Sequence, residues 1–169
     1  MPTIRRTEPH DAAQVAACID SVARERRFLA NTKGYSAKQT RQYIQFIKSI
    51  GGVHLVVLDG ETVVGCCDIT PHTHEGLTHV GRLGMGLLPK YRRQGWGTKL
   101  VSEALGIGFS TGLERIELEV FASNAGAIKL YRNAGFREEG RKRDARRLDG
   151  QYDDIILFGL LRREWQDSR

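Results

Sequence analysis

The sequence predicts a single α/β (α+β) domain with a mixed, mostly antiparallel twisted sheet of six to seven strands and about four flanking helices. Apolar residues recur at helical spacing up to residue 50, and they alternate as in β-strands over residues 53–88. Helix-like and strand-like segments then take turns up to residue 161. Because 169 residues can bury one full core and leave little room for a second, we assign residues 1–169 to one domain.

The first fifty residues are predicted to form a strand followed by two helices. Residues 3–7 have a strand-like composition, and Pro9 suits the first turn of an amphipathic helix that runs to about Arg24. Residues 26–35 show no clear period and include Gly34, so we expect a loop there.

The second helix is predicted to begin after Ser36, because Ser36 and Gln39 have the spacing of a capping box. The glycine pair Gly51-Gly52 would end this helix. Five apolar side chains are expected to face inward from it: Tyr43, Ile44, Phe46, Ile47 and Ile50.

The middle of the chain changes to strand periodicity. Residues 53–58 and 62–70 are rich in β-formers and meet at Asp59-Gly60, which is a strong hairpin signal. A third strand is expected over residues 79–88. After a turn rich in Gly and Arg, a broad apolar stripe predicts a helix that ends at Gly112.

The last third of the chain is predicted to add a strand over residues 115–121 and a short helix with Tyr131 on its apolar face. Residues 136–147 and 151–161 then close the sheet as a hairpin around Asp149-Gly150. The basic run at residues 141–147 lies on this hairpin, and its alternation favours a solvated sheet edge over a nucleic-acid site.

Composition narrows the setting and the partner. With 26 Lys and Arg against 20 Asp and Glu, the net charge of +6 favours an anionic ligand, and residues 89–147 alone hold thirteen cations and seven anions. The absence of a signal peptide or a bilayer-length apolar run predicts a cytoplasmic protein with no membrane partner. Its three cysteines fit a reducing compartment.

A metal site is not expected. Cys66 and Cys67 lie near His72, His74 and His79, yet adjacent strand residues point to opposite faces of the sheet.

The most informative stretch is residues 87–98, which reads Leu-Leu-Pro-Lys-Tyr-Arg-Arg-Gln-Gly-Trp-Gly-Thr. A strand enters a turn with two glycines, and a helix begins directly after it. Helix N-termini carry unpaired N–H groups and partial positive charge, and Gly95 and Gly97 would let a phosphate approach the backbone. The pattern therefore predicts a phosphate site.

This turn, at Arg92-Arg93-Gln94-Gly95-Trp96-Gly97, resembles the pyrophosphate loop of the GNAT superfamily of acetyl-CoA-dependent N-acetyltransferases. A second motif follows with the family spacing Asn-x6-Tyr-x3-Gly-Phe, from Asn124 through Tyr131 to Gly135-Phe136. The resemblance covers residues 53–161, whereas the first fifty residues match only in layout. It implies a GNAT-type fold. The tail at residues 147–154 looks like the branch that acetylates free amino acids and related small amines, and the strand at residues 118–124 resembles ribosomal-protein N-terminal acetyltransferases.

The resemblance also implies a site for acetyl-CoA as co-substrate. Backbone groups of Leu87 and Leu88 would pair with the pantetheine amide, and the amides of residues 93–98 would hold the pyrophosphate. Asn124 would bond the pantetheine arm, although it can equally serve as a helix N-cap. Tyr131 would donate a proton to the departing thiolate, although its helical position also suits the core. The implied cofactor-binding set is Leu87, Leu88, Arg92, Arg93, Gln94, Gly95, Trp96, Gly97, Thr98, Asn124, Ala127 and Tyr131.

The general base is left open by the sequence. Similar ribosomal N-terminal acetyltransferases carry a Glu where this chain has Glu119, twelve residues before Tyr131. Glu119 would act directly or through water, and otherwise it is an ordinary polar strand residue. Glu117 shares its face of the strand, and His79 has the ordinary pKa for base chemistry near neutral pH.

The predicted function is N-acetyl transfer from acetyl-CoA to a primary amine, by direct attack in a ternary complex. A free amino acid or other small amine is favoured as acceptor over a protein N-terminus. The alternatives are a ribosomal-protein-type N-terminal acetyltransferase and a non-catalytic module that senses acyl-CoA. Residues 26–36 and the closing hairpin would shape the acceptor pocket, in which Asp68, Glu75, Asp153 or Asp154 could meet a cationic amine. A homodimer is compatible with the resemblance.

Overall fold

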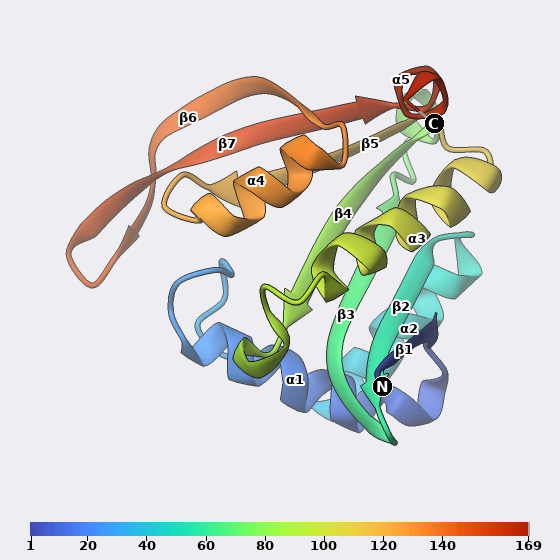
Figure 1. Cartoon of the computed structure of the whole chain (residues 1–169), viewed down its shortest axis with the longest axis vertical. Helices are drawn as coiled ribbons and strands as arrows, with labels where there is room; N and C mark the ends of the chain where they lie inside the picture. Colours follow the sequence, from blue (N-terminus) through green and yellow to red (C-terminus); the bar gives the residue numbers. More distant parts are fainter. Residues whose placement is uncertain (169) are drawn as a thin grey trace.

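The computed structural model, which describes residues 1–168, joins seven strands into one sheet in the order β1-β2-β3-β4-β5-β7-β6 (Figure 1). The strands are β1 (Thr3–Arg6), β2 (Val53–Asp59), β3 (Thr62–Pro71), β4 (Val80–Leu87), β5 (Arg115–Phe121), β6 (Arg137–Leu148) and β7 (Gln151–Leu161). The helices are α1 (Ala12–Arg24), α2 (Ala37–Ser49), α3 (Trp96–Ser110), α4 (Ala125–Asn133) and α5 (Arg162–Asp167). Neighbouring strands are antiparallel except β4 and β5. The predicted fold class is confirmed.

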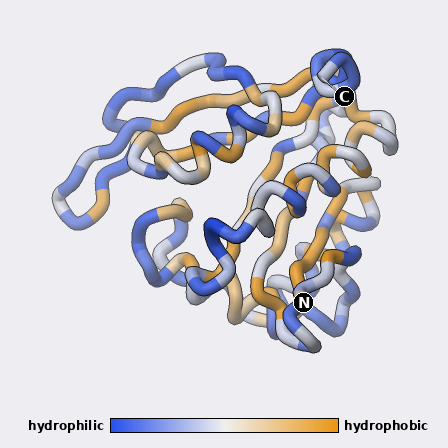
Figure 2. The backbone as a smooth tube through the Cα atoms, viewed as in Figure 1, coloured by the Kyte–Doolittle hydropathy of each residue, from blue (hydrophilic) through white to orange (hydrophobic). Residues whose placement is uncertain are grey.

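Two buried clusters fix the layers. On one face, α3 and α4 pack over β2 to β5 and β7 around residues such as Leu100, Ile116 and Phe158. On the other face, α1 packs over β2 and β3 through Val15 and Cys18. Figure 2 shows the hydrophobic residues concentrated in the central strands and the hydrophilic ones along β6, the sheet edge. The basic run lies on this edge and is mostly exposed, as predicted.

Two expectations about helices were wrong. Tyr43 and Phe46 do not face the core: they are 41% and 46% exposed, and only Ile44 and Ile47 of the predicted inward set are buried. Five apolar positions span a wider arc of the helix than one packing face can cover.

The short α5 was not predicted, because six residues are too few to show a helical period. The aromatic contact of Trp165 with Phe109, at 5.3 Å between ring centroids, supports it.

The important irregularity of the sheet lies between β4 and β5. Their pairing covers only Val80–Arg82 opposite Arg115–Glu117. Beyond these residues the two strands diverge (Figure 1), because β5 stays paired with β7 along its whole length. The sheet therefore opens along the rest of β4, and the candidate site lies at this opening.

Candidate active site

A cleft of about 830 Å³ occupies the opening between β4 and β5. Side chains alternate between the two faces of a strand. Residues from both faces of β4 line the cleft: Leu83 lies on the face covered by α3, whereas Arg82 and Gly84 lie on the face covered by α1. Glu119 and Phe121 of β5 form the opposite wall. The cleft thus passes through the sheet and can receive one ligand from each face.

The open edge of β4 offers unpaired backbone groups. Leu88 N donates to Val64 O at 2.9 Å and His72 N donates to Val80 O at 2.9 Å, which fixes even-numbered residues as the ones bonded to β3. The backbone groups of Leu83, Met85 and Leu87 therefore point to the opening. Leu88, one of the two predicted pairing partners, has both groups bonded, since its carbonyl accepts from Tyr91 N at 3.0 Å. Leu87, the other, has its carbonyl bonded by Arg92 Nε and offers its N–H, whereas both backbone groups of Met85 point to the opening.

The glycine turn forms the end of the cleft next to α3. Arg93 has φ of 58° and Gly95 has φ of 84°, so the chain turns twice through the left-handed region before the helix begins. Successive amides in such a turn converge as an anion-binding concavity. Gly97 permits close packing as well, because a Cβ there would lie 2.8 Å from Leu130 Cδ1. Arg93, Gly95, Gly97 and Thr98 line the cleft.

The side chains of the other two residues of the predicted turn, Gln94 and Trp96, make contacts outside the cleft. Gln94 Nε2 donates to Lys90 O at 2.6 Å, and the Trp96 ring lies 4.5 Å from Lys99 Nζ. Neither Gln94 nor Trp96 is among the residues that line the cleft. The Gln94 side chain bonds within the turn and the Trp96 ring contacts the first turn of α3.

The Arg92 side chain makes contacts that the sequence motif does not predict. Its Nε donates to Leu87 O at 2.8 Å, and its two terminal nitrogens donate to Glu25 at 2.8 and 2.5 Å. The guanidinium also lies 4.8 Å from the centroid of the Phe28 ring. Arg92 therefore ties the segment that follows α1 to the end of β4, and its charge is compensated by Glu25 rather than left free at the glycine turn.

The second motif brings Asn124 and Tyr131 to the same cleft. Asn124 Oδ1 accepts from Ala127 N at 3.2 Å, so the N-cap role is confirmed, and its amide group still faces the cleft that Ala127 also lines. Tyr131 is 6% exposed and packs edge-on against Phe136. Its hydroxyl has no hydrogen-bond partner among residues 1–168. Burial raises the pKa of Tyr131, which keeps the phenol protonated and able to donate a proton.

The three base candidates are separated by the fold. Glu119 lines the cleft and bonds Lys142 Nζ at 2.7 Å through Oε1, while Oε2 lies 3.4 Å from Arg82. Glu117 lies outside the cleft lining, paired with His72 and with Arg115. His79 is exposed before β4 and is likewise not part of the lining. Of the three, Glu119 is brought to the site, although both of its oxygens face cations.

The side of the cleft that faces α1 is built by segments distant in sequence. Arg27, Phe28, Leu29 and Ala30, which follow α1, line it together with Ile155 of β7. The sequence pointed to this loop and hairpin only as regions, because neither carries a pattern that places individual side chains. Arg82 and Met85 were not expected at the site, and no local signal marks them.

The mouth on this side is bridged by arginines. Arg26 forms an ion pair with Asp149 at 2.7 Å, between the loop after α1 and the tip of the β6–β7 hairpin. Arg146 donates to the carbonyls of Arg26 and Arg27 at 3.0 and 3.2 Å, and its guanidinium lies 4.2 Å from the Phe121 ring centroid. Figure 1 shows the loop lying beneath the hairpin tip. These contacts narrow the entrance.

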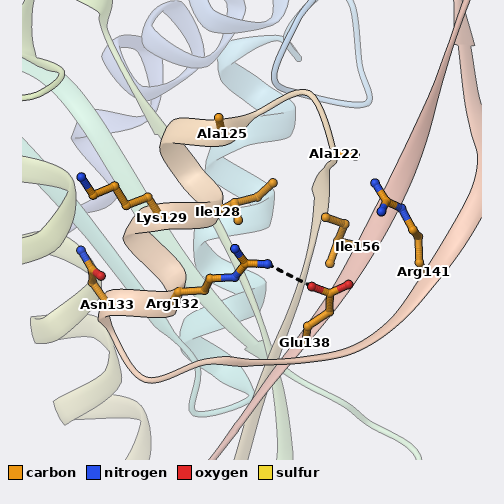
Figure 3. Close-up of a pocket in the computed structure, with 9 residues that line it drawn as sticks. All are labelled: Ala122, Ala125, Ile128, Lys129, Arg132, Asn133, Glu138, Arg141 and Ile156. Atoms are coloured by element: carbon orange, nitrogen blue, oxygen red, sulfur yellow. Dashed lines mark hydrogen bonds and ion pairs between the residues drawn. The ribbon is translucent and has the colours of Figure 1, made fainter.

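A second cavity of about 460 Å³ lies on the other side of α4, between that helix and the hairpin (Figure 3). Two of its three cationic side chains are paired, since Arg132 bonds Glu138 at 3.1 Å and Arg141 bonds Asp154 at 2.7 Å. None of the predicted site residues lines it. The motifs therefore converge on the cleft through the sheet.

Neither metal ligation nor membrane insertion gains support from residues 1–168. In this part of the chain no three His, Cys, Asp or Glu side chains gather as a metal site. Cys66 and Cys67 pack into opposite clusters, as their adjacency predicted, and burial raises the pKa of both thiols. No described helix combines the length and apolarity that crossing a bilayer requires.

Comparison with known proteins gives one consistent result. The model of the Acetyltransferase (GNAT) family matches residues 19–136. Uncharacterized N-acetyltransferase p20 of Bacillus licheniformis is 29% identical over 96% of this chain and 94% of its own. The L-amino acid N-acetyltransferase AaaT of Escherichia coli is 32% identical over 62% of this chain and 65% of its own. A phosphinothricin acetyltransferase from Sinorhizobium meliloti, solved with AcCoA, superimposes with a TM-score of 0.89 at 18% identity, covering 95% of this chain and 88% of that one.

Proposed function

Because the chain belongs to the GNAT family of acetyltransferases and its acetyl donor is acetyl-CoA, we propose that it acetylates the primary amine of a free amino acid or another small amine. The observation that carries this proposal is the cleft through the sheet, with the glycine turn at one end and charged side chains at the other. Donor and acceptor can enter it from opposite faces. Both can then be bound together, and the amine attacks the acetyl carbon directly.

The donor half of the proposal assigns each cleft residue a role. The amides of residues 93–98 bind the pyrophosphate, and the open edge of β4 at Met85 and Leu87 pairs with the pantetheine amide. Asn124 bonds the pantetheine arm. Tyr131 donates a proton to the thiolate, and it is suited to this role because its unpartnered hydroxyl lies in the cleft lining and is protonated at neutral pH.

The preference for a small acceptor rests on the entrance. Arg26, Arg146 and Asp149 bridge the loop and the hairpin on the acceptor side, an arrangement that favours a small amine over a side chain on a folded surface. The partial match to an L-amino acid acetyltransferase points the same way. A flexible protein N-terminus is the competing acceptor.

The proposal is tested by measuring thiol release from acetyl-CoA with a panel of amines. The panel contains free amino acids, aliphatic diamines and short peptides with free N-termini, and products are identified by mass. Acetylated small amines with kcat/KM well above that of every peptide support the proposal. Turnover of peptides alone would assign the chain to N-terminal acetylation. Binding of acetyl-CoA by calorimetry without turnover of any amine would instead indicate a sensor.

A further inference from the structure

The position of the Asp68 carboxyl is fixed by the fold and cannot be read from the sequence alone. It lies on β3 directly opposite Gly84 of β4, on the face covered by α1 and α2. Gly84 has no side chain, and a Cβ built there would lie 3.2 Å from Asp68 Oδ1. Gly84 is itself part of the cleft wall. Asp68 is not itself among the residues that line the cleft, but its Oδ1 lies directly behind Gly84, where no side chain separates the carboxyl from the cleft.

One oxygen of this carboxyl is held while the other is free. Oδ2 accepts from Tyr43 Oη at 3.0 Å and from Thr70 Oγ1 at 3.2 Å. Oδ1, the atom next to Gly84, has no partner among the described residues. A carboxyl anchored through one oxygen is oriented, and its second oxygen remains available to a ligand.

The other acids once considered for the amine lack this arrangement. Glu75 is exposed in a short turn before β4 and does not line the cleft. Asp153 accepts from Ser123, and Asp154 pairs with Arg141. Glu119 lines the cleft, but each of its oxygens faces a cation, Arg82 or Lys142. An ammonium would have to compete with these cations at Glu119, whereas Asp68 Oδ1 is unopposed at hydrogen-bond distance.

We propose that Asp68 binds the ammonium group of the acceptor and takes its proton, which makes it the catalytic base of the acetyl transfer. This inference rests on the proposed function and deepens it. Asp68 accepts one proton from R–NH3⁺, which yields the neutral amine. The amine nitrogen then bonds to the acetyl carbon, and the C–S bond breaks. The second nitrogen proton passes to the sulfur through Tyr131, and Asp68 returns its own proton to water.

The surroundings of Asp68 are compatible with this role. Burial raises the pKa of Asp68 to about 6, against the opposing effects of its bonds to Tyr43 and Thr70 and of the Arg82 charge. A base with such a pKa is ionised at neutral pH yet holds a proton better than an ordinary carboxylate. The group thus combines the charge that attracts an ammonium with the basicity that removes its proton.

The other titratable groups around Asp68 do not change their protonation state near neutral pH. His54, opposite Asp68 on β2, is buried with its pKa lowered to about 4, so it remains neutral. Burial raises the pKa of Tyr43 on α2 and of Cys66 on β3, so both remain protonated. Arg82 on β4 is the cation whose charge acts on Asp68. A rate change near pH 6 would therefore report Asp68 rather than these groups.

The test compares Asp68→Asn with Glu119→Gln, using acetyl-CoA and the amine from the panel that the unmodified protein acetylates best. We expect Asp68→Asn to lower kcat at pH 7 about 100-fold, the lower range for loss of a general base. The rising limb of kcat near pH 6 should disappear, and the residual rate should climb with pH as free amine becomes available. Affinity for acetyl-CoA, measured by calorimetry, should not change. Asparagine is isosteric and keeps an acceptor for Tyr43 and Thr70, so the fold is preserved.

Two further variants secure the interpretation. Gly84→Ala places a methyl group between Oδ1 and the cleft, and it should raise the KM for the amine without weakening acetyl-CoA binding. Glu75→Gln removes an acid away from the cleft and should leave all parameters unchanged. If Asp68→Asn keeps the limb near pH 6 and Glu119→Gln removes it, Asp68 is not the base although the enzyme is an acetyltransferase. If the unmodified protein acetylates no amine, the proposed function itself is overturned.

Discussion

The two ends of the cleft differ in composition: one is built mainly from backbone groups and the other from side chains. The end next to α3 consists mainly of backbone, namely the amides of the glycine turn, the open edge of β4 at Met85 and the N–H of Leu87. The end next to α1 consists of side chains from several elements, including Arg82 and Glu119, with Asp68 behind Gly84. A backbone site needs only a local conformation, whereas a side-chain site needs the whole fold.

This difference matches the ligand that we propose for each end. The acetyltransferases of the family use acetyl-CoA as donor, and a donor site made of backbone groups does not depend on which side chains surround it. The acceptor differs from enzyme to enzyme, and side chains can change without disturbing the sheet. Tyr131 lies between the two ends, and Arg92 connects them. Substitutions at these two residues are therefore the sharpest probes of how separate the ends are.

The largest expected effect is on Tyr131→Phe. The hydroxyl has no partner in the described chain, and a phenylalanine ring keeps the edge-on contact with Phe136. We expect kcat to fall about 100-fold or more through loss of the proton donor. The dissociation constant of acetyl-CoA and the melting temperature should stay close to their original values.

Tyr152→Phe is the matched control, because Tyr152 is 59% exposed at the hairpin tip. It should leave kcat unchanged. An equal, small loss in both variants would show that Tyr131 is a packing residue and that the thiolate leaves without help from it.

The next effect concerns the connection between the ends. Arg92→Ala removes charge-assisted bonds to Glu25 and Leu87, and Glu25→Gln weakens the same pair from its other side. Bonds of this kind contribute about 1.5–3 kcal/mol. We expect both variants to loosen the loop after α1 and to raise the KM for the amine about tenfold.

Acetyl-CoA affinity separates the two possible roles of Arg92. A structural role predicts that both variants leave the calorimetric dissociation constant nearly unchanged. A large loss of acetyl-CoA affinity in Arg92→Ala alone would mean that this guanidinium leaves Glu25 and acts on the pyrophosphate. The predicted cofactor role of Arg92 would then stand, and the two ends would be less separate than the geometry suggests.

The same contrast explains how far the sequence could be read. The strand segments, the glycine turn, Asn124 and Tyr131 follow from local patterns, because each depends on residues close together in the chain. Asp68 and Gly84 are 16 positions apart and meet only through the register of β3 and β4. The sequence named Asp68 as one of four acids, but nothing local could choose among them. Tyr43 was assigned to the core because periodicity cannot distinguish a buried ring from one that reaches across to a carboxyl.

The smallest expected effect is on stability, and it probes Asp68 without any substrate. Its pKa of about 6 in the folded chain exceeds the ordinary value of about 3.9, so the folded state binds more protons than the unfolded state between those values. The free energy of unfolding therefore falls as pH rises from about 4 to 6. Two pKa units correspond to at most about 3 kcal/mol, and partial solvent screening reduces the expected loss to about 1 kcal/mol. Asparagine does not titrate. Urea unfolding should show Asp68→Asn gaining about 1 kcal/mol on the original protein between pH 4 and pH 8, whereas a constant gap would mean that the carboxyl is as well solvated as in water.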